Sequence, residues 1–370
     1  MQNRNYKSYP GSVVIAFVAL AAGSFGQAQA QAPAQTHAPA LAATASAAPD
    51  AADGHIISLD VQVSDKLGHH VAGLTQGDFT LLDNKQPAKI LSVQEVDTRD
   101  AATDPVHVVI VVDTINTSFD VIAREREQLG EFLKQDGGKL AHRTSMVVFT
   151  EKGIQIEKAS IRDGNALAAA LNGANSELRI EGRGAGFWGA SDMLQWSLQQ
   201  LTELVSYEGT QPGRKLVFFL SPGWPLLPYA GIDETDKQRQ WNFTAVVALT
   251  NQLRQSQTTL YSLTPYTLGR SDPFFYKGYL KPVLNADHAE YPDLGLQVLA
   301  THSGGLVQTT GMDVLGEINV AMRDANSFYT VTFEAAPGDK QNEYHALDLR
   351  TDKPDAAVRT VSGYYANAPR

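Results

Sequence analysis

A short region near the N-terminus is patterned for β-strands. Apolar and polar residues alternate from Ile57 to Val63, and a polar turn follows. Alternation with a period of two predicts a strand with one buried face. Two shorter runs of this kind occur at residues 79–82 and 89–96. We therefore expect a small N-terminal β segment over residues 54–99.

From residue 106 onward, apolar strand-like runs alternate with amphipathic stretches. The first run, VHVVIVV, is apolar almost throughout, which is typical of a strand covered on both faces of a parallel sheet. In the stretch that follows, Ile122 and Leu129 fall on one helical stripe with charges opposite. Strands separated by helices predict an α/β domain over residues 104–325. Its sheet should be doubly wound and mostly parallel, with helices on both faces.

The last part of the chain returns to strands without helices, in SFYTVTFEA, EYHALDLRT and AVRTVSGYYA. This C-terminal β segment, residues 326–370, has the character of the N-terminal one. We expect the two segments to pair into a small accessory β module, with the α/β domain inserted between them.

The N-terminus has the layout of a leader. Arg4 and Lys7 precede the apolar run SVVIAFVALAAG, and small and polar residues follow up to Ala30. This predicts a signal peptide over residues 1–30, because a membrane anchor needs a longer run of about 20 apolar residues. We expect an exported protein, periplasmic or extracellular, without membrane insertion after cleavage. The Ala/Pro-rich residues 31–53 are expected to form a disordered linker.

Composition excludes several functional classes. The formal net charge is −10 without a cluster of basic residues, so we expect no nucleic-acid partner. The chain has no cysteine, which excludes disulfides, thiolate metal sites and cysteine nucleophiles.

The segment VVIVVDTINTSFD, residues 108–120, joins the first parallel strand to the first helix. This segment and the order of elements over residues 106–325 resemble the von Willebrand factor type A (VWA) domain family. The flanking GLTQGDFTLLDNKQPAKI and VSGYYA are similar to secreted VWA-related proteins of Acidobacteria. The resemblance implies a VWA-like fold and a binding role, and it implies no substrate.

VWA domains bind ligands through a metal-ion-dependent adhesion site (MIDAS), and the resemblance implies which residues would form it. Asp113 and Thr117 match the first and third residues of its Asp-x-Ser-x-Ser motif, but Ile115 replaces the middle serine. Ser191 stands for an expected threonine, and Pro222 for an expected aspartate. Because Mg²⁺ needs several oxygen ligands, we expect a degenerate site and no cofactor. The alternative is weak Mg²⁺ binding by Asp113, Thr117 and Ser191.

The same turn also has a structural interpretation. Asn116, Thr117 and Ser118 precede a helix, where such side chains accept hydrogen bonds from free N–H groups. Backbone donors of the turn would hold the Asp113 carboxylate. If Asp113 and Thr117 instead point inward to a metal, Asn116 is expected to point away from it.

No catalytic motif is recognisable in the sequence. Gly-x-Ser-x-Gly, His-Glu-x-x-His and the phosphate-binding glycine loop with Lys-Ser/Thr are all missing. The pattern Gly-x-Gly-x-x-Gly occurs once, at residues 184–189, well inside the domain, and we interpret it as a loop.

One polar stretch places four side chains that could bind a cation close together: Asp287, His288, Glu290 and Asp293. We expect these side chains to be solvated. A periplasmic hydrolase that combines this cluster with Asp113 is the enzymatic alternative.

Aromatic residues concentrate in loops near the expected ligand face. Exposed aromatic side chains are typical of protein-binding surfaces. The candidate partner-binding residues are Phe187, Trp188, Trp224, Tyr229, Phe274, Phe275 and Tyr276. The alternative is that these side chains bury one another in a satellite core. Together these patterns predict an exported, non-enzymatic protein of adhesion or scaffold type that binds an unknown protein partner.

Overall fold

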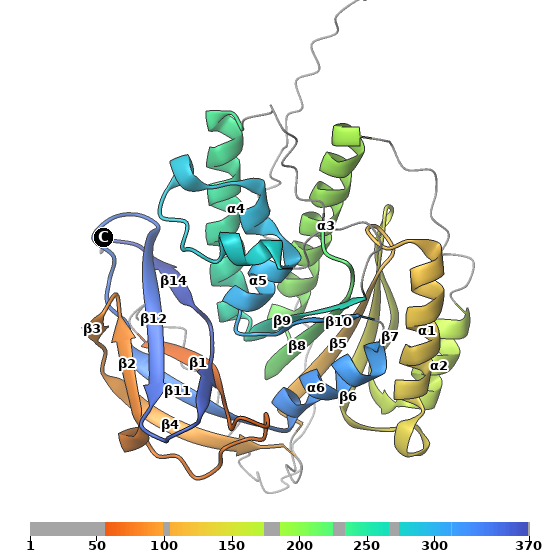
Figure 1. The fold of residues 1–370 in the computed structure, drawn as a ribbon, viewed down its shortest axis with the longest axis horizontal. Coiled ribbons are helices and arrows are strands. Elements are labelled where there is room, and N and C mark those ends of the chain that lie inside the picture. Colours follow the sequence, from red (N-terminus) through yellow and green to blue (C-terminus); the bar gives the residue numbers. More distant parts are fainter. Residues whose placement is uncertain are drawn as a thin grey trace, which may run out of the picture. The chain divides into compact units, whose positions relative to one another are not determined.

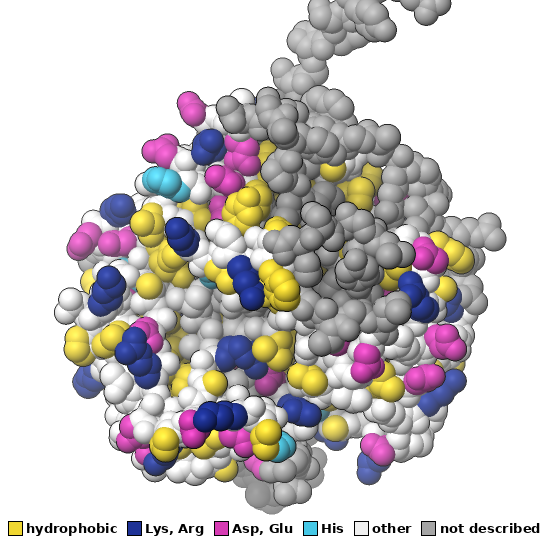
Figure 2. Space-filling view, viewed as in Figure 1, with side chains coloured by type: hydrophobic (Ala, Val, Ile, Leu, Met, Phe, Trp, Pro, Cys, Tyr) yellow, Lys and Arg dark blue, Asp and Glu magenta, His cyan; other side chains and the backbone are white. Residues whose placement is uncertain are grey.

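The computed structural model describes residues 56–98, 104–173, 186–224, 234–265, 274–311 and 313–368. The predicted signal peptide and linker lie outside these ranges and stay predictions. Within them, no helix combines the length and the apolar character needed to cross a membrane. On the face drawn in Figure 2, Lys and Arg side chains are interspersed with Asp and Glu side chains.

A six-stranded sheet forms the centre of the α/β domain (Figure 1), with the order β10-β9-β8-β5-β6-β7. Its strands are β5 (Val106–Asp113), β6 (Lys139–Thr150), β7 (Gly153–Asp163), β8 (Arg214–Leu220), β9 (Thr258–Pro265) and β10 (Val307–Gly311). Neighbouring strands are parallel, except that β7 pairs antiparallel with β6 at one edge. The chain first builds outward from β5 to β7 and then outward from β8 to β10. The strand order therefore reverses between β5 and β8, which is where open α/β sheets have their ligand crevice.

Helices cover both faces of this sheet (Figure 1). They are α1 (Phe119–Leu133), α2 (Gly164–Gly173), α3 (Gly186–Gly209), α4 (Asp236–Gln255), α5 (Leu296–His302) and α6 (Val314–Asn326). Val109 and Val111 of β5 belong to the core under α3, α4 and α5, whereas Val108 and Ile110 belong to the core under α1, α2 and α6. A strand buried on both faces needs an apolar side chain at nearly every position, which explains the run VHVVIVV. The predicted doubly wound α/β fold is confirmed.

The flanking segments pair into one β module of two four-stranded sheets, with the orders β13-β1-β11-β4 and β14-β12-β2-β3. Its strands are β1 (Ile56–Ser64), β2 (Phe79–Asp83), β3 (Gln86–Pro87), β4 (Ile90–Asp97), β11 (Ser327–Glu334), β12 (Glu343–Thr351), β13 (Ala357–Arg359) and β14 (Gly363–Ala366). β11 of the C-terminal segment lies between β1 and β4 of the N-terminal segment, antiparallel to both. Leu59, Tyr329 and Phe333 belong to a separate core of this module. The predicted accessory module is therefore confirmed.

Buried polar contacts join the β module to the α/β domain. Nε of Arg214 in β8 lies 3.5 Å from Oδ2 of Asp60 in β1, and Nη1 donates to the backbone carbonyl of Asp324 in α6 at 2.8 Å. The Asp324 carboxylate accepts a hydrogen bond from the Tyr261 hydroxyl at 2.7 Å and pairs with Arg359 of β13. Because a buried charge is costly without a partner, these contacts fix the module against the domain.

Candidate functional site at the carboxyl edge of the sheet

The candidate site lies at the reversal of the strand order. Asp113 is the last residue of β5, and Ser221 directly follows β8, its parallel neighbour. Both side chains are fully buried. The sheet topology therefore brings together two polar residues that are 108 positions apart in the sequence.

The Asp113 carboxylate accepts four hydrogen bonds from protein groups. Oδ1 accepts the backbone N–H groups of Ile115 (3.0 Å) and Asn116 (3.1 Å). Oδ2 accepts the Asn116 side-chain amide (2.8 Å) and the Ser221 hydroxyl (2.7 Å). The prediction that backbone donors of the turn hold Asp113 is confirmed. The expectation that Asn116 points away is wrong, because the turn brings residue i+3 back over the carboxylate.

Neighbouring elements hold these donors in place. The Asn116 amide also lies 2.9 Å from Oγ of Ser197 in α3, and the Ser221 hydroxyl accepts the backbone N–H of Gly223 at 3.1 Å. Gly223 has φ of 90°, and a Cβ there would lie 2.3 Å from the Gln297 amide. The loop after β8 therefore requires glycine at this position.

The start of α1 differs from the sequence prediction in one detail. Ser118 is the N-cap residue, but its side chain accepts no hydrogen bond from the helix. The hydroxyl bonds instead to Asp120, and this bond lowers the pKa of that exposed carboxyl. Thr117 is fully buried next to this position.

The side chains around Asp113 fit a divalent cation poorly. Ile115 is buried in the apolar core and supplies no oxygen. Ser191 lies inside α3, whereas the sequence placed it before the helix, and it makes no hydrogen bond to Asp113. The acceptor positions of the single carboxylate are already used by protein donors. Among the described residues, no group of three or more His, Cys, Asp or Glu side chains is arranged to hold a metal ion.

A second buried carboxyl, Glu125 of α1, lies near the site. It is 1% exposed, and neither carboxyl oxygen has a hydrogen-bond partner. Burial raises its pKa well above the ordinary value, and the charges of Asp113 and Glu317 raise it further. Burial also raises the pKa of Asp113, while its four hydrogen bonds act in the opposite direction. Glu125 has no such hydrogen bonds, so of the two carboxyls it is Glu125 that favours the protonated form.

Glu125 was not predicted to be buried, because the charged residues of α1 were all expected on its exposed face. Its position in the helix nevertheless predicts that it is buried. Glu125 lies four residues after Val121 and four before Leu129, so it belongs to the buried stripe of the helix.

The aromatic candidates divide into buried and exposed residues. Trp224 has no exposed surface and packs edge-on against Phe219 at 6.0 Å between ring centroids. Tyr276 is buried as well. For these two the prediction of a partner-binding role is wrong, since core packing has already covered their rings. Phe275 is half-buried, and Phe274 is 48% exposed with the Lys277 ammonium 4.5 Å from its ring centroid.

The other aromatic candidates are not described. The side chains of Phe187 and Trp188 and the whole of Tyr229 lie outside the described residues. The backbone of residues 186–189 is helical, so the loop expected there ends earlier than the sequence indicated. The structure adds Phe119, the first residue of α1, which is 62% exposed and lies six positions after Asp113.

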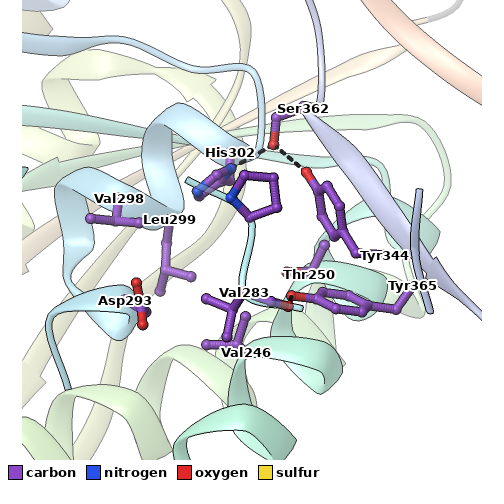
Figure 3. A pocket seen from close by; sticks show the side chains of 11 residues that line it. Val246, Thr250, Val283, Asp293, Val298, Leu299, His302, Tyr344, Ser362 and Tyr365 are labelled. Atoms are coloured by element: carbon purple, nitrogen blue, oxygen red, sulfur yellow. Dashed lines mark hydrogen bonds between the residues drawn. The ribbon is translucent and has the colours of Figure 1, made fainter. Parts of the chain in front are cut away.

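The polar stretch around residue 290 is only partly solvated. Asp287, His288 and Glu290 are exposed, but Asp293 is buried. Asp293 lines a cavity of about 20 Å³, the room of one water molecule, where α4 and α5 meet the β module (Figure 3). Asp113 is not among the residues that line this cavity. The cavity therefore does not join the two halves of the hydrolase alternative.

Two serine–histidine pairs look catalytic at first sight. Nδ1 of His302 lies 2.5 Å from Oγ of Ser362 beside the small cavity in Figure 3, which has no room for a substrate. His107 bridges Glu208 and Ser145 at 2.9 Å each. These three side chains are all buried, so a substrate cannot reach them.

Comparisons with known proteins concern the fold alone. No protein-family model matches the chain, and no curated protein does. Among solved structures, it is similar to manganese-loaded Plasmodium vivax TRAP protein, with 9% identity and a TM-score of 0.31 over 75% of this chain and 98% of that chain. The VWA domain of SpRpn10 shows 12% identity and a TM-score of 0.28, over 58% of this chain and 93% of that chain. The human COPII-coat protein Sec24c shows 10% identity and a TM-score of 0.32 over 75% of this chain and 46% of that chain. The chain therefore spans less than half the length of that protein.

Proposed function

We propose that the chain is an exported, non-enzymatic protein of adhesion or scaffold type. Its VWA-like domain would bind another protein through the loops at the carboxyl edge of the sheet, next to a degenerate MIDAS. The observation that carries this proposal is the Asp113 carboxylate, which four protein donors already satisfy. A cation would have to displace these donors before it could bind, so binding should not depend on a divalent metal.

The proposed contact surface is apolar and aromatic. Phe119 begins the helix after β5, and Phe274 follows β9 in the sequence, and both rings are exposed. Large exposed aromatic side chains are frequent anchors of protein interfaces. The partner should therefore offer an apolar pocket or groove. Phe187, Trp188 and Tyr229 stay proposed members of the same surface, and export rests on the leader of residues 1–30.

Site-specific photocrosslinking tests the surface. A photoreactive phenylalanine analogue at residue 119 should capture a defined partner in cells. The matched control places the analogue at Tyr207, which is 51% exposed near the C-terminal end of α3. Capture at 119 and not at 207 supports the proposal. Equal capture at both positions, or none at 119, would contradict it.

Calorimetry tests the metal dependence separately. Mg²⁺, Mn²⁺ and Ca²⁺ are titrated into the mature protein and into Asp113→Asn, which preserves the shape of the side chain. We expect no binding, or binding in the millimolar range, for both proteins. Micromolar binding that is lost in Asp113→Asn would support the Mg²⁺-dependent alternative.

A further inference from the structure

A groove of about 580 Å³ lies in the β module. Its walls are the β2–β3 turn, the residues that follow β11 and the start of β12, and β2, β3 and β12 lie together in Figure 1. Pro87, Ala336 and Pro337 are exposed in these walls, and Ala88 and Ala335 also line the groove. The groove therefore presents small apolar side chains to solvent.

The charged residues of the groove differ in how firmly they are paired. Asp83 is buried, and its carboxylate accepts hydrogen bonds from Nδ1 of His345 at 2.9 Å and from the Tyr364 hydroxyl at 2.7 Å. Nζ of Lys89 lies 3.6 Å from Oε2 of Glu334, and both of these side chains are mostly exposed. An exposed ion pair contributes little, so Lys89 can take another anionic partner.

The first described strand begins beside this groove. Ile56, the first residue of β1, pairs with Glu334, and Ile57 pairs with Phe333. In an antiparallel pair the residue numbers rise on one strand as they fall on the other. Continued toward the N-terminus, this register sets residues 53–55 opposite residues 335–337. The chain thus approaches β1 along the apolar wall of the groove.

The segment that leads into β1, residues 49–55, has a sequence that suits this surface. It reads PDAADGH, and its alanines and glycine allow a close approach to the alanine and proline side chains of the wall. Its two aspartates are negative, and residues 31–55 contain no Lys or Arg. The charge of the segment is therefore complementary to Lys89 and to the exposed Lys85 of the β2–β3 turn.

Docking within the chain has a low entropic cost. Four of the seven residues are Gly, Ala or Pro, whose side chains lose no rotamer freedom on burial. Ile56 is already fixed in the sheet, so the segment is held next to the groove at an effective concentration on the order of millimolar or more. A contact too weak to form between separate molecules can therefore form here.

We propose that residues 49–55 lie in this groove as an extended stretch, with the alanines against Ala88 and Ala336 and the aspartates toward Lys89. The segment covers the apolar wall, and the free part of the tether is then residues 31–48. This contact is independent of the carboxyl edge of the sheet and of the partner proposed there.

Backbone ¹⁵N relaxation of the mature protein tests the contact residue by residue. Residues 50–53 should show order parameters of about 0.85, like the strands of the module, and values below about 0.6 would overturn the proposal. Residues 41–46 of the tether provide the flexible reference. The measurement is made at two protein concentrations. Order that appears only at the higher one would assign the groove to a second copy of the chain and overturn the proposal as well.

Two variants test whether the groove is the cause of this order. Ala336 is exposed in the groove wall, so the ring of Ala336→Phe should displace the segment. The order parameters of residues 50–53 should then fall below about 0.6, while those of β1 and β11 stay unchanged. Ala357→Phe is the matched control, because Ala357 is exposed on β13 and pairs with Ser64 at the far end of β1. Unchanged order of residues 50–53 in folded Ala336→Phe would overturn the assignment to this groove.

Discussion

Oγ of Ser221 lies 2.7 Å from Oδ2 of Asp113, and this hydrogen bond connects the loop after β8 to the end of β5. The sequence placed Pro222, the next residue, at the missing aspartate of the MIDAS. Pro222 instead directs its carbonyl to the Gln297 amide at 3.3 Å. The side chain of this loop that reaches the Asp113 carboxylate is thus a neutral hydroxyl, which donates a hydrogen bond.

The first prediction is that two added oxygen ligands beside Asp113 create a metal site. Ile115→Ser with Ser221→Asp adds a hydroxyl and a carboxylate beside Asp113. Without metal, two buried carboxylates repel each other, so the double variant should be less stable than the wild type in EDTA. Mg²⁺ should then stabilise it, by about 2.7 kcal/mol at 100 times its Kd. Thermal unfolding with and without 5 mM MgCl₂ measures the effect.

The wild type serves as one control, and its melting temperature should not respond to Mg²⁺. Ile115→Ser with Ser221→Asn is the other, since it has similar volume and lacks the new charge. If this neutral pair responds to Mg²⁺ as strongly as the charged pair, the added carboxylate is not the cause.

The architecture could be predicted from sequence because its signals are local. The unbroken apolar run of β5 and the alternation in β1 each follow from which faces are covered. The pairing of the flanks followed from their similar character. The two-residue strand β3 was missed, since so few residues carry no periodicity, and the predicted strand AVRTVSGYYA divides into β13 and β14.

The second prediction concerns Glu125, the buried carboxyl of α1 without a hydrogen-bond partner. Its raised pKa means that the folded protein keeps a proton that the unfolded chain releases near pH 4.5. Stability must therefore fall as the pH rises from about 4.5 through the folded pKa. Glu125→Met removes this loss and should therefore raise the free energy of unfolding at pH 8.

Urea denaturation at pH 5 and pH 8 measures this change, and the gain should be larger at pH 8. Glu127→Met is the matched control, because Glu127 lies on the exposed side of the same helix. It should stay within about 0.5 kcal/mol of the wild type at both pH values. A loss of stability in Glu125→Met at pH 8 would show that the carboxyl has a partner.

The third prediction concerns Asp293, which lines the small cavity beside the β module. Burial raises its pKa to about 7, with further increases from the charges of Glu290 and Glu234. The folded protein again holds a proton that the unfolded chain releases near pH 3.8. This group should thus lower stability between about pH 4 and pH 7, by up to ~4 kcal/mol in total.

Asp293→Asn should remove that part of the pH dependence. The amide oxygen can still accept the N–H of Glu290, which now donates to Oδ2 at 2.8 Å. Chemical denaturation from pH 4.5 to pH 8 compares the slopes of the two proteins. Asp287→Asn, an exposed neighbour, should follow the wild type. Parallel slopes for the wild type and Asp293→Asn would contradict the prediction.

The candidate site was harder to predict than the fold, because its contacts are not local. Asp113 could be chosen from its place after a buried strand. Its partner Ser221 is 108 residues away, and only the register of β5 against β8 brings the two together. The sequence alone could not show that Ser221, and not its neighbour Pro222, is the residue that bonds to Asp113.

The last prediction separates aromatic residues that build the core from those that remain free to bind. Trp224→Ala should lower the free energy of unfolding by about 3–5 kcal/mol, because Trp224 is fully buried against Phe219. Phe274→Ala should change it by less than about 0.5 kcal/mol, because Phe274 is 48% exposed. Urea denaturation measures both values. If Phe274→Ala proved as destabilising as Trp224→Ala, the Phe274 ring would belong to the core and could not contribute to the proposed contact surface.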